Sequence, residues 1–324
     1  MIVTLKDITT KITKGTTPTS IGCKFEKSGI NFIKSESLVD GKTIDKSKFA
    51  FISERTHERL KRSQIEENDI LFSMAGMFLG KTGIATAEVV PANTNQAVAI
   101  IRVDDTKANY EYVYYYLNQK SVIHTINTTS AQSAQPNINL KQIGKIKINL
   151  PNRKKQDQIV SLLSAIDLKI SNNVEINDNL FAQMQALYAA WFIDCIPFGG
   201  IKPSSWQKTS IYTIADIIYG APFSSKQFNT DGKGIPIIRI RDLKEQKVAT
   251  YTTEKHPKGY LLQAGDIVVG MDGEFVPYIW GSDEAWLNQR VCVFKNKRLK
   301  GKAFLYFTIK PLLYLSLIHI SEPT

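Results

Sequence analysis

Gly29-Ile30-Asn31-Phe32-Ile33-Lys34 and Gly234-Ile235-Pro236-Ile237-Ile238-Arg239 are two versions of one short segment in a chain of 324 residues. Each version begins at a glycine, continues as an apolar run with β-branched residues and ends at a cation. This pattern predicts a buried strand. Self-similarity between distant segments indicates a chain built from repeated modules.

Further matches follow in the same order along the chain, while the offset drifts only from 205 to 192 residues. The matched pairs are Gly15 with Gly220, Asn68–Leu71 with Gly265–Val268, Met74–Gly76 with Met271–Gly273, Asn95–Val98 with Asn288–Val291, and Tyr112–Tyr115 with Phe304–Phe307. Chance similarity does not keep several blocks in register. The sequence therefore predicts two domains of the same fold.

Each repeat is expected to be an α+β domain of ordinary size, with boundaries at 1–150 and 196–310. Short β-rich runs that end at glycine turns predict the strands, and the aromatic run Tyr110–Leu117 has helix-compatible spacing. The predicted strands are Ile30–Lys34, Asp69–Phe72 and Ala97–Val103 in the first repeat, and Ile235–Ile240, Asp266–Val269 and Arg290–Phe294 in the second.

The segment between the repeats, 151–195, has a different texture. No glycine or proline occurs from Lys154 to Trp191, and apolar residues recur at heptad spacing, which predicts one long helix with a coiled-coil seam. An ordinary amphipathic core helix is the alternative, although this helix would be about three times the usual length. The seam comprises Ile159, Leu163, Ile166, Ile170, Asn173, Asn177, Leu180, Met184, Leu187 and Trp191.

Charge is distributed in two basic blocks. Lys and Arg outnumber Asp and Glu by 41 to 30, a formal net charge of +11. Residues 1–150 carry 20 basic and 14 acidic groups, and residues 196–324 carry 17 and 11, whereas 151–195 is nearly neutral. Two basic modules on a neutral connector suit a nucleic-acid partner, and plain solubility is the alternative.

The three cysteines, Cys23, Cys195 and Cys292, are far apart and form no CxxC pair. This usage argues against disulfides and structural zinc, and it fits a reducing cytoplasm. The sequence shows no leader pattern at its start and no apolar run long enough to span a bilayer, so no membrane partner is expected.

The middle segment also resembles a known family. Ile148-Asn149-Leu150-Pro151, Gln156-Asp157-Gln158-Ile159-Val160 and the later run Gln185-Ala186-Leu187-Tyr188 are similar to the conserved region of type I restriction–modification specificity subunits. That resemblance implies two target recognition domains, each followed by such a helix, with the two helices paired antiparallel. It also implies that each domain reads one half of a split DNA target.

The resemblance further implies a chain without catalytic or metal-binding residues. Its partners would be double-stranded DNA, modification (methyltransferase) subunits and restriction/translocase subunits. S-adenosylmethionine, ATP and Mg²⁺ would belong to those partner subunits, with no cofactor on this chain.

One departure from the family pattern concerns the end of the chain. A counterpart of residues 121–192 is not present after Phe307, and 311–324 match nothing in the first repeat. We therefore expect an incomplete second recognition domain followed by an aberrant tail. The seam of the middle helix would then have no partner in the same chain.

Base recognition needs Arg, Lys, Asn or Gln on a rigid element, and the repeats place such residues at matched positions. Asn-Gln before a strand has an alternative role in bonding the backbone of a turn, and Glu36 and Asp272 have the alternative role of orienting an Arg. The candidate DNA-binding residues are Lys34, Glu36, Ser73, Asn95, Gln96, Arg239, Arg241, Asp272, Asn288, Gln289 and Arg290.

Two rival functions stay open. A half-length specificity protein would pair as a homodimer through residues 154–191. A DNA endonuclease would use Asp242, Glu245 and Lys247, although three common charged residues after a strand are a weak signal. The run from Gly76 to Thr82 falls one residue short of a phosphate-binding loop, and a turn closing a strand pair is the better interpretation.

Overall fold

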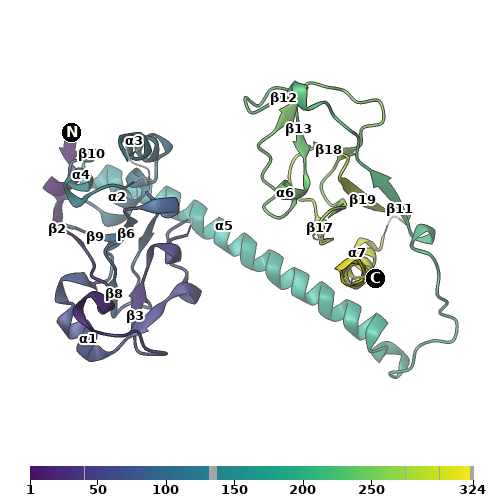
Figure 1. Cartoon of the computed structure of the whole chain (residues 1–324), viewed down its shortest axis with the longest axis horizontal. Coiled ribbons are helices and arrows are strands. Elements are labelled where there is room, and N and C mark those ends of the chain that lie inside the picture. The colour runs from purple at the N-terminus through teal and green to yellow at the C-terminus, as the bar shows by residue number, and fades with distance from the viewer. Residues whose placement is uncertain (40, 131–136, 274, 299, 322–324) are drawn as a thin grey trace. The chain divides into compact units, whose positions relative to one another are not determined.

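The computed structural model describes residues 1–39, 41–130, 137–273, 275–298 and 300–321 (Figure 1). It separates into two compact units, Met1–Asn172 and Asn173–Thr324. The long helix α5 (Arg153–Tyr188) begins in the first unit and ends in the second. The division therefore falls within the helix that the sequence assigns to a connector of its own.

Unit 1 contains two four-stranded sheets. The first has the order β2-β9-β6-β7 and is antiparallel, and the second has the order β4-β3-β8-β5, in which β3 and β8 are parallel. The strands of the first sheet are β2 (Thr9–Lys14), β9 (Val98–Val103), β6 (Ile70–Ser73) and β7 (Thr82–Ile84); those of the second are β4 (Ala50–Ile52), β3 (Ile30–Ile33), β8 (Ala92–Thr94) and β5 (Gln64–Ile65).

The two central strands of the first sheet, β6 and β9, are buried on both faces, which explains their continuous apolar runs. Ile70 and Phe72 enter one hydrophobic cluster, whereas Leu71 between them enters another. Ile101 and Ile100 of β9 are divided in the same way. Successive side chains of a strand point to opposite faces, so these two strands each contribute to two layers of core.

Unit 2 repeats this topology. Its sheets have the orders β11-β19-β16-β17 and β12-β14-β13-β18-β15, and β13 and β18 are the parallel pair. Only the short strand β12 has no counterpart among the described strands of the second sheet in unit 1. The strands are β11 (Ala215–Tyr219), β19 (Val291–Asn296), β16 (Ile267–Gly270), β17 (Pro277–Ile279), β12 (Phe228–Asn229), β14 (Tyr251–Thr252), β13 (Ile235–Ile238), β18 (Ala285–Leu287) and β15 (Leu261–Leu262).

The predicted duplication is thus confirmed for the two main sheets of each unit. One boundary is corrected: β13 ends at Ile238, because the short helix α6 (Ile240–Leu243) begins where the sequence predicts the strand to continue. The Arg239 N–H donates to the Asp242 carboxylate at 3.1 Å, which closes that turn.

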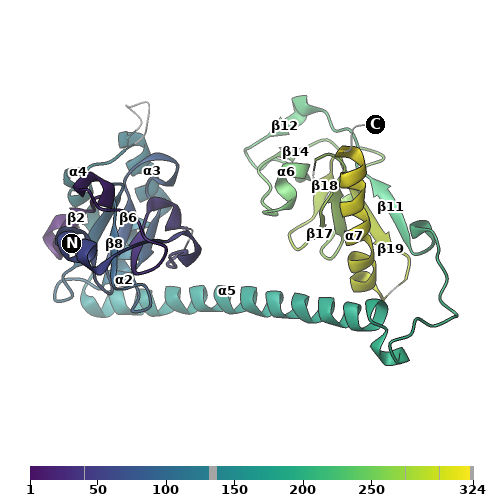
Figure 2. The same ribbon diagram turned by 60° about the horizontal axis from the view of Figure 1, so that its bottom comes forward.

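Corresponding helices cover corresponding sheets. In unit 1, α2 (Tyr110–Leu117) starts at Asn109, whose side chain accepts the N–H groups of Glu111 and Tyr112, and it has the predicted bounds. In unit 2, α7 (Lys302–Ser321) packs on β16 and β19 and also contacts the last turns of α5 (Figure 2). The remaining elements are α1 (Glu54–Arg59), α3 (Lys120–Ser130), α4 (Leu140–Gly144) and the antiparallel pair β1 (Ile2–Thr4) and β10 (Lys147–Asn149).

The long helix agrees with its prediction, except that its last turn is a π-helix at Ala189–Ile193. All residues from 165 to 180 are exposed, including Asn173 and Asn177 of the seam. Ile166 is 48%, Ile170 58% and Leu180 51% exposed. The seam residues nearer the ends, Ile159, Leu163 and Met184, are half-buried, whereas Leu187 and Trp191 are exposed.

The middle of the predicted seam is therefore uncovered in the described chain. Residues 311–321, which the sequence assigns to an aberrant tail, continue α7, and residues 322–324 of that tail lie outside the described residues.

Candidate nucleic-acid interface

Most candidate residues of each unit follow directly after the carboxyl ends of its two parallel strands. In unit 1, Ile33 of β3 pairs with Thr94 of β8, and the Thr94 hydroxyl donates to the Ile33 carbonyl at 2.7 Å. Paired parallel strands end at the same edge of a sheet. Lys34 and Asn95, which follow these strands, therefore emerge side by side.

Unit 2 has the same arrangement. Ile238 of β13 pairs with Leu287 of β18. The Asn288 N–H donates to the Ile238 carbonyl at 3.2 Å. Arg239 and Asn288 thus occupy the places that Lys34 and Asn95 occupy in unit 1.

The turn after the central strand of the other sheet reaches the same end. In unit 1 the Met74 N–H donates to the Ala97 carbonyl at 2.8 Å, next to Gln96. In unit 2 the Met271 N–H donates to the Arg290 carbonyl at 2.9 Å, next to Asp272. Two strand ends and one turn therefore gather the predicted residues of each unit in one place.

A glycine fixes this place in both units. A Cβ on Gly15 would lie 1.8 Å from the Thr94 carbonyl oxygen, and one on Gly220 would lie 2.0 Å from that of Asn288. These distances are far below any real contact, so only glycine lets the end of β2 in unit 1, and of β11 in unit 2, approach the Asn-Gln turn. The Gly15 N–H also donates to the Asn95 carbonyl at 3.0 Å.

In unit 1 the candidate side chains differ in their exposure and in the contacts that they already make. Asn95 Oδ1 accepts the Ala97 N–H at 3.1 Å, which is the turn-bonding alternative. Lys34 is half-buried, with its Nζ 3.7 Å from Glu36 Oε1 and 5.4 Å from the Phe25 ring. Gln96 is exposed and hydrogen-bonds through Oε1 to the Thr17 hydroxyl.

In unit 2, Arg239 is engaged with its own loop. Its Nε lies 3.4 Å from the Asp242 carboxylate, and its Nη2 donates to the Thr250 hydroxyl. Arg241 is 67% exposed and lies 3.7 Å from the other Asp242 oxygen. Arg241, unlike Arg239, is consequently exposed to solvent.

The second cation of unit 2 is Arg290, whose Nη1 lies 2.9 Å from Asp272 Oδ2. The structure thus shows Asp272 in its alternative role of orienting an arginine. Both side chains remain more than 60% exposed, so the pair is accessible. Gln289 beside it is exposed and Asn288 is half-buried.

The structure corrects the prediction that Ser73 binds DNA. Its side chain is completely buried at the end of β6, and its hydroxyl has no hydrogen-bond partner among the described residues. The strand continues one residue further than predicted and takes Ser73 into the sheet. It is not available to a base.

Sequence reasoning missed three residues, Thr17, Arg59 and Arg62, which lie in or against the loop that follows Gly15 in unit 1. Besides Thr17, Arg62 donates through Nη2 to the Thr16 hydroxyl at 2.9 Å, and Arg59 donates to the Ile21 carbonyl at 3.1 Å. Arg59 and Arg62 lie outside the matched blocks of the repeat. Their position beside the loop that follows Gly15 could have been found only from the packing.

The endonuclease alternative is not favoured by the geometry. Asp242 is buried and already binds Arg239 and Arg241, while Glu245 and Lys247 are exposed. Among the described residues, no group of three or more His, Cys, Asp or Glu side chains is arranged to hold a metal ion. Residues 76–82 form a turn that leads from β6 into β7.

Within the described part of the chain, none of the helices is long and apolar enough to cross a membrane.

Two copies of one α+β module share a single helix, and each presents polar and cationic side chains at the same strand ends. This arrangement defines a two-module recognition protein. The family model for the type I restriction modification DNA specificity domain matches residues 1–180 and 203–321, and the chain belongs to this family.

Individual relatives agree with the family match. The chain is 40% identical over 116 residues to the type I restriction enzyme EcoBI specificity subunit of Escherichia coli, covering 36% of this chain and 24% of that protein. It is 24% identical over 164 residues to the MjaIX specificity subunit of Methanocaldococcus jannaschii, covering 47% and 38%. The matches thus span well under half the length of these curated relatives.

The crystal structure of a type I restriction–modification S subunit from M. genitalium is similar over 100% of this chain and 80% of that one, with a TM-score of 0.53 and 14% identity. At that identity the similarity concerns the fold alone.

Proposed function

We propose that this chain is the DNA-binding specificity subunit of a type I restriction–modification complex. Each unit reads one half of a bipartite duplex target and directs methylation and cleavage by partner subunits. The proposal rests on one arrangement that occurs in both units. Both units bring a cation and an Asn-Gln pair to the ends of their parallel strands.

The chemistry of the exposed side chains supports base reading. Glutamine and arginine can each make two hydrogen bonds to a base edge in the major groove. Gln96 in unit 1 and Gln289 in unit 2 are exposed just after the ends of β8 and β18, and Arg241 is exposed on α6, which follows β13. The basic surplus of both units suits contacts with phosphates.

The partners and cofactors follow from the same proposal. The chain would act in the cytoplasm with modification subunits that bind S-adenosylmethionine and with restriction/translocase subunits that use ATP and Mg²⁺. On this proposal the chain has no catalytic role of its own.

Selection from a DNA library by the chain reconstituted with modification subunits tests the proposal. The expected result is enrichment of two short motifs at a fixed separation. The purified chain alone, with Mg²⁺ and S-adenosylmethionine, should neither cut nor methylate DNA. Enrichment of no motif, or turnover by the isolated chain, contradicts the proposal.

A second candidate, self-association through residues 154–191, is supported by the uncovered seam. Ile166, Ile170 and Leu180 are each about half exposed on one face of α5. Exposed apolar stripes of this kind mark protein contacts. Two copies of the chain could cover each other's seam, as in a half-length specificity protein.

A further inference from the structure

The side chain of Lys42, in the loop that follows β3, contacts two helices of unit 1. Its Nζ lies 2.9 Å from Glu111 Oε1 on α2 and 3.1 Å from the Ser164 hydroxyl on α5. It also lies 3.9 Å from Asp167 Oδ2 and 4.5 Å from the centre of the Tyr115 ring. One half-buried lysine therefore joins the loop after β3 to α2 and α5.

Tyr115 and Asp167 complete the cluster. The Tyr115 hydroxyl donates to Asp167 Oδ2 at 2.6 Å. Burial, together with this hydrogen bond, raises the pKa of Tyr115, so the phenol stays protonated and remains a donor. We call Lys42, Glu111, Tyr115, Ser164 and Asp167 the outer junction.

The ammonium group stays charged at neutral pH. Partial burial by itself lowers the pKa of Lys42, but its contacts with Tyr115 and Glu111 outweigh that effect and leave the pKa above its ordinary value. Because the pKa of Lys42 is raised, its ammonium group stays protonated at every pH below the ordinary lysine pKa. The charge is lost only in strong alkali. Lys42 therefore carries its positive charge in the outer junction at physiological pH.

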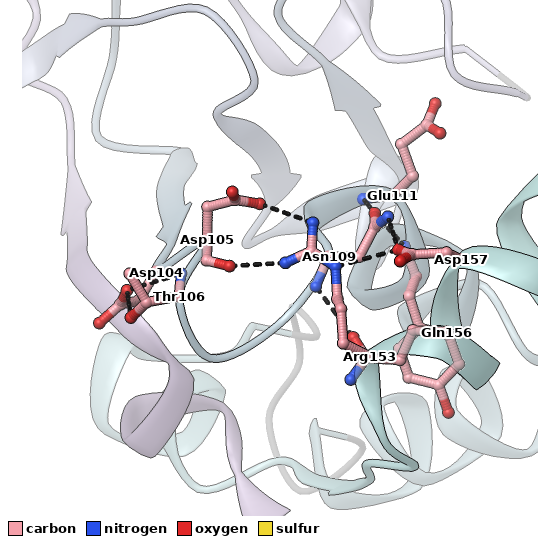
Figure 3. Close-up of polar contacts among 9 residues, drawn as sticks. Asp104, Asp105, Thr106, Asn109, Glu111, Arg153, Gln156 and Asp157 are labelled. Carbon is pink, nitrogen blue, oxygen red and sulfur yellow. Dashed lines mark hydrogen bonds and ion pairs between the residues drawn. The ribbon is translucent and has the colours of Figure 1, made fainter.

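The first turn of α5 is attached to unit 1 by a separate cluster (Figure 3). The Asn109 N–H donates to Gln156 Oε1 at 2.9 Å, and Asn109 Nδ2 donates to Asp157 Oδ1 at 2.9 Å. Arg153 donates to the Asp105 carbonyl at 2.6 Å and to Asp157 at 3.0 Å. We call these five residues the inner junction.

The two junctions lie at different places along one rigid helix. Asp157 and Asp167 are ten residues apart, which is about 15 Å of helix at roughly 1.5 Å per residue. A rod held at one point can pivot, whereas a rod held at two separated points cannot. After Asp167 the next residues of α5 are all exposed as far as residue 180.

We propose that Lys42 is a positioning residue, which holds α5 in one direction relative to unit 1 and thereby sets the separation of the two DNA half-sites that the protein accepts. This inference rests on the proposed function, because a separation has meaning only for a bipartite target.

The length of the helix makes the effect measurable. From Asp157 to Tyr188, α5 extends for about 46 Å at roughly 1.5 Å per residue. Without the outer junction the helix can pivot about the inner junction, and a pivot of about 5° there moves the far end by about 4 Å. Since base pairs stack about 3.4 Å apart, such a pivot corresponds to roughly one base pair of target.

The test is selection from a library in which the preferred half-sites are separated by every length of random spacer, with the chain reconstituted with modification subunits. We expect Lys42→Met to broaden the accepted spacer lengths, or to shift them by about one base pair. The base preference within each half-site should stay unchanged, which also shows that the variant is folded. Lys42→Arg should retain the original spacer preference.

Lys46→Met is the matched control, because Lys46 lies in the same loop but pairs with Glu88 at 2.5 Å rather than with α5. Its spacer preference should equal that of the unmodified protein. An unchanged spacer preference in Lys42→Met, with half-site preference retained, overturns the inference. Loss of all half-site preference in the unmodified complex overturns the proposed function instead.

A second measurement does not depend on DNA. Spin labels at the exposed positions 54 on α1 and 175 on α5, in the full chain with Cys23, Cys195 and Cys292 replaced by alanine, report the direction of the helix. We expect a narrow distance distribution that becomes wider in Lys42→Met but not in Lys46→Met. Equal widths in all three proteins overturn the inference.

Discussion

At the scale of single residues, the glycine that opens each repeat determines the shape of the candidate interface. Gly15→Ala would place a methyl group against the backbone of Thr94, and backbone atoms cannot rotate away as a side chain can. We expect the free energy of unfolding to fall by about 1–3 kcal/mol, the typical cost of overpacking. Chemical denaturation measures this change.

Gly144→Ala is the control for this substitution. Its added Cβ would meet the nearest atom, Lys6 Cβ, at 3.5 Å, which is an ordinary contact. We expect no more than a small change in stability there. Equal stability losses at the two positions would mean that the contact of Gly15 with the Asn-Gln turn has no special role.

The exposed polar residues should act on separate half-sites. Arg241→Ala or Gln289→Ala is expected to relax base preference only in the half-site read by unit 2, and Gln96→Ala only in the other. The loss of a bidentate base contact should cost about 1–3 kcal/mol against the preferred base. Target selection with each variant measures this.

Arg239→Ala provides an internal comparison, because the Arg239 side chain is held by Asp242 and Thr250. We expect it to reduce stability more than specificity. A uniform loss of affinity for all sequences in Arg241→Ala and Gln289→Ala would assign these residues to phosphate contacts.

At the scale of elements, the exposed seam of α5 should drive association. Burying apolar surface contributes about 25 cal/mol per Å², and Ile166, Ile170 and Leu180 are each about half exposed. We expect the purified chain to form dimers or larger species as its concentration rises. Replacing these three residues with serine should leave a monomer, as measured by sedimentation.

Leu168→Ser is the matched control, because Leu168 is 62% exposed on the same helix but lies outside the heptad seam. It should not change the association. A monomer at high concentration in the unmodified chain would show that the seam is not a contact surface in isolation.

At the scale of the whole molecule, the two basic blocks should make DNA binding strongly dependent on salt. The logarithm of the binding constant should fall with the logarithm of salt concentration, by about 0.9 for each phosphate neutralised on B-DNA. Fluorescence anisotropy with a labelled duplex over a range of salt concentrations measures the slope. Binding that does not respond to salt would contradict a phosphate-contacting surface.

The sequence by itself determined the duplicated α+β architecture and the long helix. Repetition and periodicity are properties of neighbouring residues, so they can be read without knowing the packing. For this reason the strand pairs, the bounds of α2 and the extent of α5 agree closely with expectation. The repeat also placed the candidate residues at matched positions of the two modules.

Only the tertiary structure decided which of those side chains are free. Ser73 is buried, Asn95 bonds its own turn and Arg239 binds Thr250, whereas Gln96 and Arg241 remain accessible. The outer junction was equally invisible, because Lys42 and Asp167 are distant along the chain and meet only through packing. A local pattern specifies the periodicity of an element, but the hydrogen-bond partners of a polar side chain come from wherever the fold brings other elements beside it.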